Sequence, residues 1–134
     1  MRHLVSAMLV AVGVVHLLPL PGVLGSSQLA ALYGLPFDEP NLAILMRHRA
    51  VLFGLLGAFL LVAAFRSSLQ TTAFVAGFVS VGAFLWLAWS TGTYNEQLAR
   101  VFAADIGALT CLVIGATARG WVQRRARRAA LPGA

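Results

Sequence analysis

Residues 71–90 read TTAFVAGFVSVGAFLWLAWS, twenty residues without a charged side chain. At 1.5 Å per residue, a helix of this length covers about 30 Å, the thickness of the hydrocarbon core of a bilayer. Lipid offers the peptide groups no hydrogen-bond partner, so an isolated segment that crosses it must be helical. This stretch therefore predicts a transmembrane helix.

Three other apolar runs have a similar length. The first ends at Pro19 and Pro21, and the second and last carry charged residues only near their starts. The sequence therefore predicts an all-α fold, an integral membrane bundle of four transmembrane helices in a single domain, residues 1–134. The expected helices cover about residues 4–20, 42–65, 71–90 and 98–118, followed by a basic tail, 119–134.

Composition supports a membrane protein. Hydrophobic residues make up 60% of the chain and charged residues only 10%, whereas soluble domains are about a quarter charged. The net charge of +6 would suggest nucleic acid as the partner of a soluble protein. Here a run of arginines, Arg124 to Arg128, directly follows an apolar helix, which is typical of a membrane-flanking segment. We expect the lipid bilayer, and no nucleic acid, as partner.

The arginines also predict the orientation. Seven flank the helix ends on one face, namely Arg2, Arg66, Arg119, Arg124, Arg125, Arg127 and Arg128. Arg47, Arg49 and Arg100 lie toward the other face, as do all four acidic residues. The positive-inside rule then places both termini in the cytoplasm. The use of arginine without lysine is typical of GC-rich bacteria, so we expect a multi-pass protein of the bacterial inner membrane.

The N-terminal part allows an alternative interpretation of the first helix and a prediction for the loop that follows it. Arg2, the short apolar run and the small residues up to Ser26 also fit a cleaved signal peptide, which would leave three helices in the same orientation. In the first outer loop, residues 29–36 form a short amphipathic segment closed by Gly34 and Pro36. We expect this segment to be a brief helix on the membrane surface.

Polar side chains gather in the outer half of the predicted bundle. Arg49 and Asp105 each lie seven residues past an outer helix end, about 10 Å into the membrane. Ionisable groups at such depth are costly and usually face the bundle interior, where they mark functional sites. The candidate ligand-binding or structural cluster comprises His16, Arg47, His48, Arg49, Tyr94, Arg100 and Asp105.

Within this cluster, we expect Arg49 and Asp105 to contact each other, because a lone carboxylate in lipid would tend to protonate. The pair is either a structural clamp or part of a ligand or proton site, and the sequence leaves both open. His16 fits a core histidine that is hydrogen-bonded to a neighbouring helix. No metal site is predicted, because no metal-ligand spacing occurs. No cofactor is predicted either, although His16 and His48 lie at the similar depth that bis-histidine haem ligation requires.

Small residues at four-residue spacing predict close packing of the last two long helices, as at Ala73 and Gly77 or Ala104 and Ala108. Cys111 is the only cysteine, so no intramolecular disulfide can form. Phosphate-binding and hydrolase motifs are absent. The sequence identifies no catalytic residues and does not predict an enzyme.

Residues Tyr33-Gly34-Leu35-Pro36 and Arg47-His48-Arg49-Ala50-Val51-Leu52-Phe53-Gly54-Leu55-Leu56-Gly57 resemble segments of small bacterial DoxX-like four-helix membrane proteins of unassigned function. The resemblance extends from His16 to Asp105. It implies association with quinone-linked redox proteins. Members of this set are often named phosphopantetheine adenylyltransferase, but the HxGH-type motif of that soluble enzyme does not occur here.

The leading functional hypothesis is a membrane protein that binds a lipid or small apolar ligand, or that serves as a subunit of a membrane complex, through the outer polar cluster. A membrane-protein partner or a homodimer fits the small size of the bundle. The alternatives are a DoxX-like accessory to quinone-linked oxidoreduction, with quinone as its ligand, and a small proton-coupled transporter.

Overall fold

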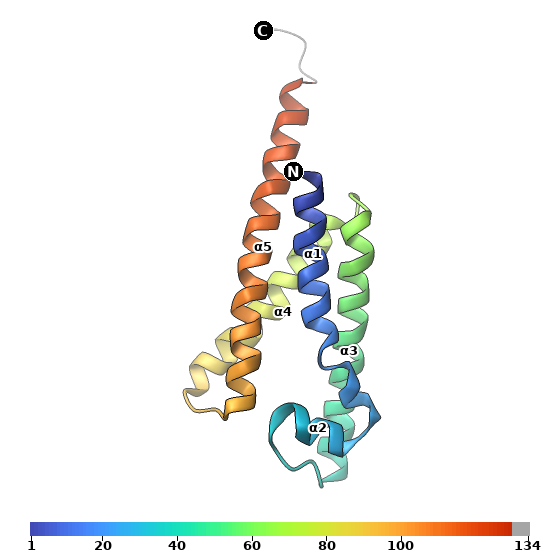
Figure 1. The fold of residues 1–134 in the computed structure, drawn as a ribbon, viewed down its shortest axis with the longest axis vertical. Coiled ribbons are helices and arrows are strands. Elements are labelled where there is room, and N and C mark those ends of the chain that lie inside the picture. Colours follow the sequence, from blue (N-terminus) through green and yellow to red (C-terminus); the bar gives the residue numbers. More distant parts are fainter. Residues whose placement is uncertain (130–134) are drawn as a thin grey trace.

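The computed structural model describes residues 1–129, and the regular structure in this range is entirely helical. Figure 1 shows the long helices side by side, with a short helix at one end. Each of the four segments is long and apolar enough to cross a membrane. The predicted all-α architecture with four candidate transmembrane helices is confirmed, and the chain is a membrane protein.

The first membrane segment combines two helical pieces. Helix α1, Arg2–Leu17, is followed by the 3₁₀ helix η1, Leu20–Leu24. Pro19 and Pro21 lack the N–H that an α-helix needs, so the chain tightens there instead of continuing as α1. Helix α2, Ser26–Tyr33, ends at Gly34, whose φ of 66° is the left-handed conformation that glycine favours. The amphipathic segment is therefore helical, but it begins three residues earlier than predicted.

The remaining helices are α3, Pro40–Phe65, α4, Gln70–Thr91, and α5, Glu96–Ala129. Helix α5 has 34 residues and is about 51 Å long, well beyond the hydrocarbon thickness. The predicted helix end at residue 118 is wrong. Residues 119–129 contain no proline, and their arginines and alanines are good helix formers, so the helix continues. The last residues of the predicted tail, 130–134, lie outside the described part.

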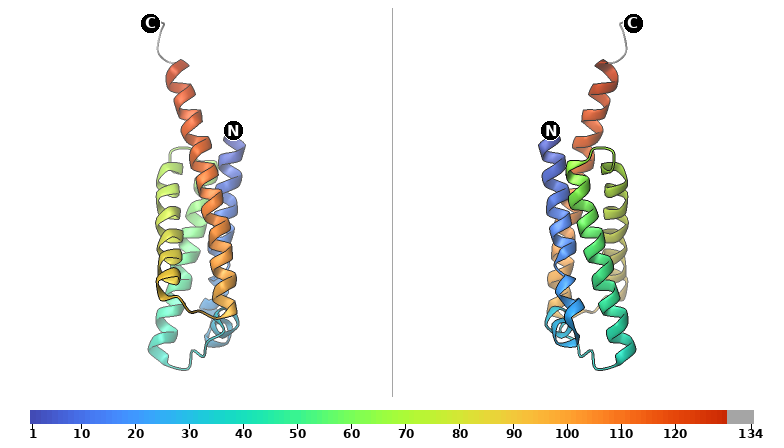
Figure 2. Two further views of the ribbon diagram at one scale, coloured as in Figure 1. Left: turned by 90° about the vertical axis from the view of Figure 1, so that its left-hand side faces the viewer. Right: turned by 90° about the vertical axis from the view of Figure 1, so that its right-hand side faces the viewer.

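The two ends of the bundle differ. The N-terminus, the connection between α3 and α4 and the last turns of α5 lie together at one end (Figures 1 and 2), which we call the terminal end. Helix α2 and the connection between α4 and α5 lie at the other, which we call the pocket end. Large apolar side chains such as Val79, Trp86 and Trp89 are exposed between the ends, as expected for a surface that faces lipid.

Most of the packed interior lies in the half of the bundle nearer the terminal end. Leu9 and Val12 of α1, Leu60 of α3 and Leu112 of α5 belong to one cluster and are fully buried. Helix α1 lies between α3 and α5 and packs against both. Gly77 of α4 lies against Leu112, so the predicted close packing of the last two long helices is present.

The backbones of α1 and α3 approach each other closely, which the small-residue pattern did not single out. A Cβ atom on Gly57 would lie 2.9 Å from the carbonyl oxygen of Gly13, and one on Gly13 would lie 3.2 Å from that of Gly57. Position 57 therefore requires glycine for the two helices to cross at this separation, and an atom added at Gly13 would force its neighbours to shift by a few tenths of an ångström. This crossing fixes α1 against α3.

A second, smaller cluster closes the pocket end. Leu29 and Tyr33 of α2 are buried together with Phe37, and Met46 and Leu98 pack against them. The apolar side of α2 therefore covers the ends of α3 and α5. The space between the two clusters is incompletely filled.

Candidate functional site: a pocket between the helices

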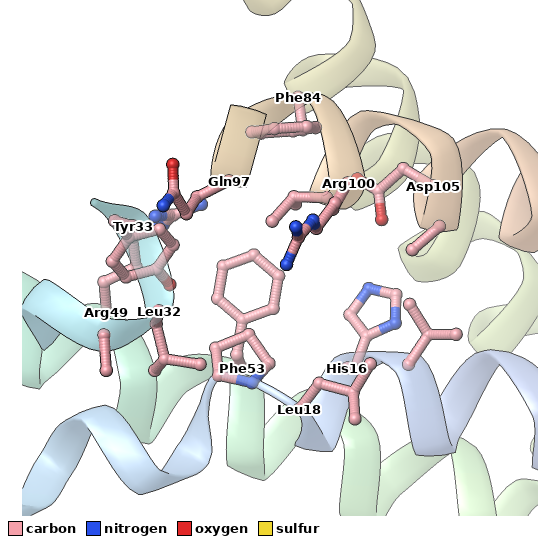
Figure 3. A pocket seen from close by; sticks show the side chains of 15 residues that line it. His16, Leu18, Leu32, Tyr33, Arg49, Phe53, Phe84, Gln97, Arg100 and Asp105 are labelled. Atoms are coloured by element: carbon pink, nitrogen blue, oxygen red, sulfur yellow. The ribbon is translucent and has the colours of Figure 1, made fainter. Parts of the chain in front are cut away.

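A cavity of about 350 Å³ lies between the two clusters. It is lined by residues of α1, α2, α3, α4 and α5, among them His16, Arg49, Phe84 and Asp105. Figure 3 shows Phe53 near the middle of the lining, His16 and Asp105 toward one end, and Tyr33 and Gln97 toward the other. Most of the remaining lining is apolar.

His16 is the most buried polar residue of this site, with 2% of its surface exposed. Its Nδ1 lies 2.9 Å from the carbonyl oxygen of Val12, and its Nε2 lies 3.1 Å from Oγ of Ser80 on α4. The ring also stacks on Phe53, with 5.6 Å between the centroids. The prediction of a core histidine that is hydrogen-bonded to a neighbouring helix is confirmed. With both nitrogens engaged and His48 exposed, the pair is not arranged to ligate haem.

Arg49 lies among aromatic rings. Its guanidinium carbon is 5.0 Å from the centroid of Phe53 and 5.5 Å from that of Tyr33, distances at which a cation is attracted to a ring face. Tyr33 belongs to α2, outside the membrane-spanning helices. Burial raises the pKa of its hydroxyl, and the charge of Arg49 counteracts this rise in part. The hydroxyl therefore stays protonated at neutral pH and can donate a hydrogen bond.

Asp105 lines the same cavity and is half-buried. The expected direct ion pair with Arg49 is not formed, because no nitrogen of Arg49 lies within 4.0 Å of the Asp105 carboxylate, although the two groups interact electrostatically. Instead, the guanidinium lies by Phe53 and Tyr33. The two opposite charges thus share one pocket without neutralising each other by contact.

The other predicted cluster residues divide into two groups. Arg100 lines the pocket, as does its neighbour on the helix, Gln97. Arg47 is exposed and donates from Nε to the carbonyl oxygen of Val23 at 2.9 Å. His48 is exposed as well, and Tyr94 is exposed and stacks on Phe102. The structure therefore brings His16, Arg49, Arg100 and Asp105 together and leaves Arg47, His48 and Tyr94 outside the pocket lining.

Sequence reasoning missed several pocket residues. The residues that line the cavity include Tyr33, Phe53, Phe84 and Gln97. Aromatic residues are common in apolar helices and polar residues are common in loops, so the sequence alone did not mark these four as pocket residues. Asn95, which the sequence did not single out, links α2 to the start of α5. Its Nδ2 donates to the carbonyl oxygen of Tyr33 at 2.7 Å, and its Oδ1 accepts from the N–H of Leu98 at 2.9 Å. An asparagine just before an apolar helix is a recognisable N-cap signal, so this role could have been found.

The arrangement is suited to binding rather than to a recognised reaction. Arginine and tyrosine donors stand beside aromatic and aliphatic walls, as in pockets that hold a mostly apolar molecule by a few polar groups. Within residues 1–129, no three His, Cys, Asp or Glu side chains are close enough to share a metal ion.

Comparisons with protein-family models, curated proteins and solved structures return no significant match to this chain. The resemblance to DoxX-like proteins therefore stays a prediction from residues 33–36 and 47–57. The pocket and the distribution of charge are the features from which a function can be inferred.

Proposed function

We propose that this protein binds a small, largely apolar molecule with a hydrogen-bond-accepting polar end in the pocket between its helices. The observation that carries the proposal is the convergence of Arg49, Arg100 and Asp105 on one mostly apolar cavity of about 350 Å³. That volume lies within the range of small-molecule sites, which are usually apolar with a few polar groups.

The charge of the pocket favours an acceptor on the ligand. Two arginines face one carboxylate, and Arg49 and Asp105 form no direct ion pair. A carboxylate or carbonyl of the ligand would accept from the guanidinium groups, and charge-assisted hydrogen bonds of this kind are about twice as strong as neutral ones. Leu18 and Ala31 at the border of the pocket are exposed, so an amphiphile in the membrane has an apolar route to it.

The proposed location is the bacterial inner membrane, with the terminal end in the cytoplasm. The support is the excess of arginine at that end, together with the position of all four acidic residues toward the pocket end. In this orientation the pocket lies in the outer half of the membrane and would take its ligand from the outer leaflet.

A photoreactive long-chain carboxylic acid that carries a diazirine tests the proposal. We expect the purified protein to be labelled at pocket residues, and labelling to fall at least tenfold in Ala104→Trp, whose indole would fill the cavity. Ala103→Trp is the matched control, because Ala103 is exposed and does not line the pocket. Equal labelling of the two variants would contradict the proposal, as would labelling spread evenly over the lipid-facing surface.

The second candidate is a DoxX-like accessory to quinone-linked oxidoreduction. The observation that favours it is the aromatic wall of Phe53 and Phe84, with Arg49 close to the Phe53 ring. A flat ring with carbonyl acceptors would fit between such groups. Competition by a lipid-soluble benzoquinone against the diazirine acid distinguishes the candidates. Displacement at equimolar concentration supports quinone, and undiminished labelling at a tenfold excess of quinone excludes it.

A further inference from the structure

A second hollow lies at the terminal end, about 720 Å³ in volume. It is bounded by the start of α1, the connection between α3 and α4, and the last turns of α5. Its polar lining consists of His3, Ser6, Ser67, Ser68, Gln70, Arg119 and Gln123. We call this hollow the terminal cleft. It has no residue in common with the pocket described above.

Arg119 is the fixed cation of the terminal cleft. Its guanidinium donates to Oε1 of Gln70 and, at 2.9 Å, to Oγ1 of Thr71, both at the start of α4. Gln70 is itself buried, and its Nε2 donates to the carbonyl oxygen of Ala64. A guanidinium has five N–H donors, so three remain after these two bonds. The side chain is thus held in place while most of its donors stay available.

Among the described residues, the lining contains no carboxylate that could compete for these donors. The four acidic residues, Asp38, Glu39, Glu96 and Asp105, all belong to the segments nearer the pocket end. On the adjoining turns of α5, Arg124, Arg125 and Arg128 lie with Trp121 on one side, and the guanidinium of Arg125 is 3.6 Å from the Trp121 ring centroid. The electrostatic field at this end therefore attracts anions.

The terminal cleft is also amphipathic and lies at the depth of lipid headgroups. Val5, Phe65, Val122 and Ala126 form apolar parts of its wall. Arg119 lies 23 residues after Glu96, so it is about 35 Å along α5, just beyond the hydrocarbon core. Apolar surface beside fixed cationic and hydroxyl donors at this level matches one class of molecule, a phospholipid whose headgroup carries a net negative charge.

We infer that the terminal cleft binds the headgroup of an anionic phospholipid, with Arg119 contacting the phosphate. The arginines on the last turns of α5 attract the anionic headgroup at long range and do not contact it in the terminal cleft. The site is independent of the proposed pocket ligand and needs only the membrane location of the chain.

Native mass spectrometry of the detergent-purified protein tests this inference. The probes are phosphatidylglycerol and phosphatidylcholine with identical acyl chains, offered at equal concentration. We expect phosphatidylglycerol to be retained at least tenfold more strongly. We expect Arg119→Gln to abolish the preference, because both lipids carry a phosphate and the cleft then lacks the fixed positive charge that favours a net anionic headgroup over a zwitterionic one. Arg47→Gln, the same change at an exposed position near the other end, should leave the preference intact. Absence of a preference in the unaltered protein overturns the inference.

A second variant keeps the test valid if Arg119→Gln does not fold. Gln123→Glu places a carboxylate at the terminal cleft, on an exposed position of α5, and should lower phosphatidylglycerol retention about fivefold. Gln28→Glu on the exposed side of α2 is its control. If Arg124→Gln/Arg128→Gln lost the preference and Gln123→Glu kept it, the lipid would bind on the outer side of α5. The assignment of the terminal cleft as the binding site would then be overturned. If inorganic phosphate at the same concentration displaced phosphatidylglycerol, the cleft would be a phosphate-ion site, and the choice of a lipid would be overturned.

Discussion

His16 shows how one polar residue is accommodated inside an apolar bundle. The imidazole would be costly in this environment if its nitrogens had no partner. Nδ1 is hydrogen-bonded to the carbonyl oxygen of Val12 on its own helix, and Nε2 is hydrogen-bonded to the hydroxyl of Ser80 on α4. The Phe53 ring covers one face of the imidazole. The residue thereby joins α1 to α4, two helices that otherwise touch little.

The bond between His16 and Ser80 should contribute measurably to stability. Ser80→Ala leaves Nε2 without its partner, and we expect the free energy of unfolding in detergent to fall by about 0.5–1.5 kcal/mol, a typical cost for one interhelical hydrogen bond. In a His16→Leu background the same serine change should cost little, which a double-mutant cycle would reveal. Ser90→Ala is the control, since that hydroxyl bonds only a carbonyl of its own helix. Equal losses for Ser80→Ala in both backgrounds would contradict the prediction.

At the scale of elements, the crossing of α1 and α3 depends on two glycines. A methyl group on Gly57 would meet the backbone oxygen of Gly13 and the side chain of Leu17, both at 2.9 Å. A side chain can rotate away from such a contact, but a helix backbone cannot move without separating the two helices. The crossing therefore tolerates no added volume.

We expect Gly57→Ala to lower the free energy of unfolding by about 1–3 kcal/mol, the usual cost of overpacking. Gly82→Ala on α4 is the matched control, because a Cβ atom there meets nothing within 4 Å. That control should be neutral or stabilising by up to about 1 kcal/mol, since alanine favours helix over glycine. The measurement is the free energy of unfolding of both variants and of the unaltered protein under the same conditions. Equal stability of the two variants would refute the proposed crossing.

The start of α3 depends on the charge of one exposed residue. The carboxylate of Glu39 accepts from the backbone N–H groups of Asn41 and Leu42, at 2.9 and 2.6 Å. These bonds hold the pKa of Glu39 below its usual value of 4.5. A lowered folded pKa means that the stabilisation is complete above the unfolded pKa and is lost as the pH falls through the folded one.

Glu39→Gln should therefore destabilise the protein at pH 7, and the difference should shrink as the pH falls below 4.5. Thermal unfolding of the two proteins across this pH range is the measurement. Asp38→Asn removes the same charge one residue earlier and should show a smaller effect at pH 7. A difference for Glu39→Gln that is independent of pH would mean that the cap does not act through its charge.

At the scale of the molecule, hydropathy and length predicted the architecture because a bilayer imposes both on any helix that crosses it. The end of α5 was not predictable in this way, since Arg119 and the arginines after it leave the membrane without ending the helix. Depth counting predicted that His16, Arg49 and Asp105 would all lie in the outer half of the bundle. It could not predict that Arg49 would lie by Phe53 and Tyr33 instead of Asp105, because that choice depends on packing around α2.

The first helix should remain in the mature protein. Val5, Leu9 and Val12 are buried in the main cluster, and His16 bonds α4, so removal of α1 would expose the interior of α3 and α5. We expect the protein purified from membranes to retain α1, so its mass should not be reduced by that of the first 25 residues. Intact mass spectrometry is the measurement. A product that begins near Ser26 would support the signal-peptide alternative.

The orientation is testable with reporters. A fluorescent protein fused after Ala134 should be bright, and alkaline phosphatase inserted in the segment 26–41 should be active, if the terminal end is cytoplasmic. The reciprocal fusions serve as controls and should be silent. An active phosphatase after Ala134 would reverse the proposed orientation, and the pocket would then face the cytoplasmic half of the membrane.

The division of the packed interior has a consequence for the order in which the molecule opens. Among the residues that the structure describes, the main cluster contains twelve buried residues, whereas the cluster under α2 contains only Leu29, Tyr33 and Phe37. The free energy of a local opening rises with the apolar surface that it exposes. Amide hydrogens of α2 should therefore exchange with deuterium long before those of α1 and α3. Each local unfolding of α2 would expose the pocket beneath it to water. A ligand bound there would therefore exchange on the timescale of that local unfolding.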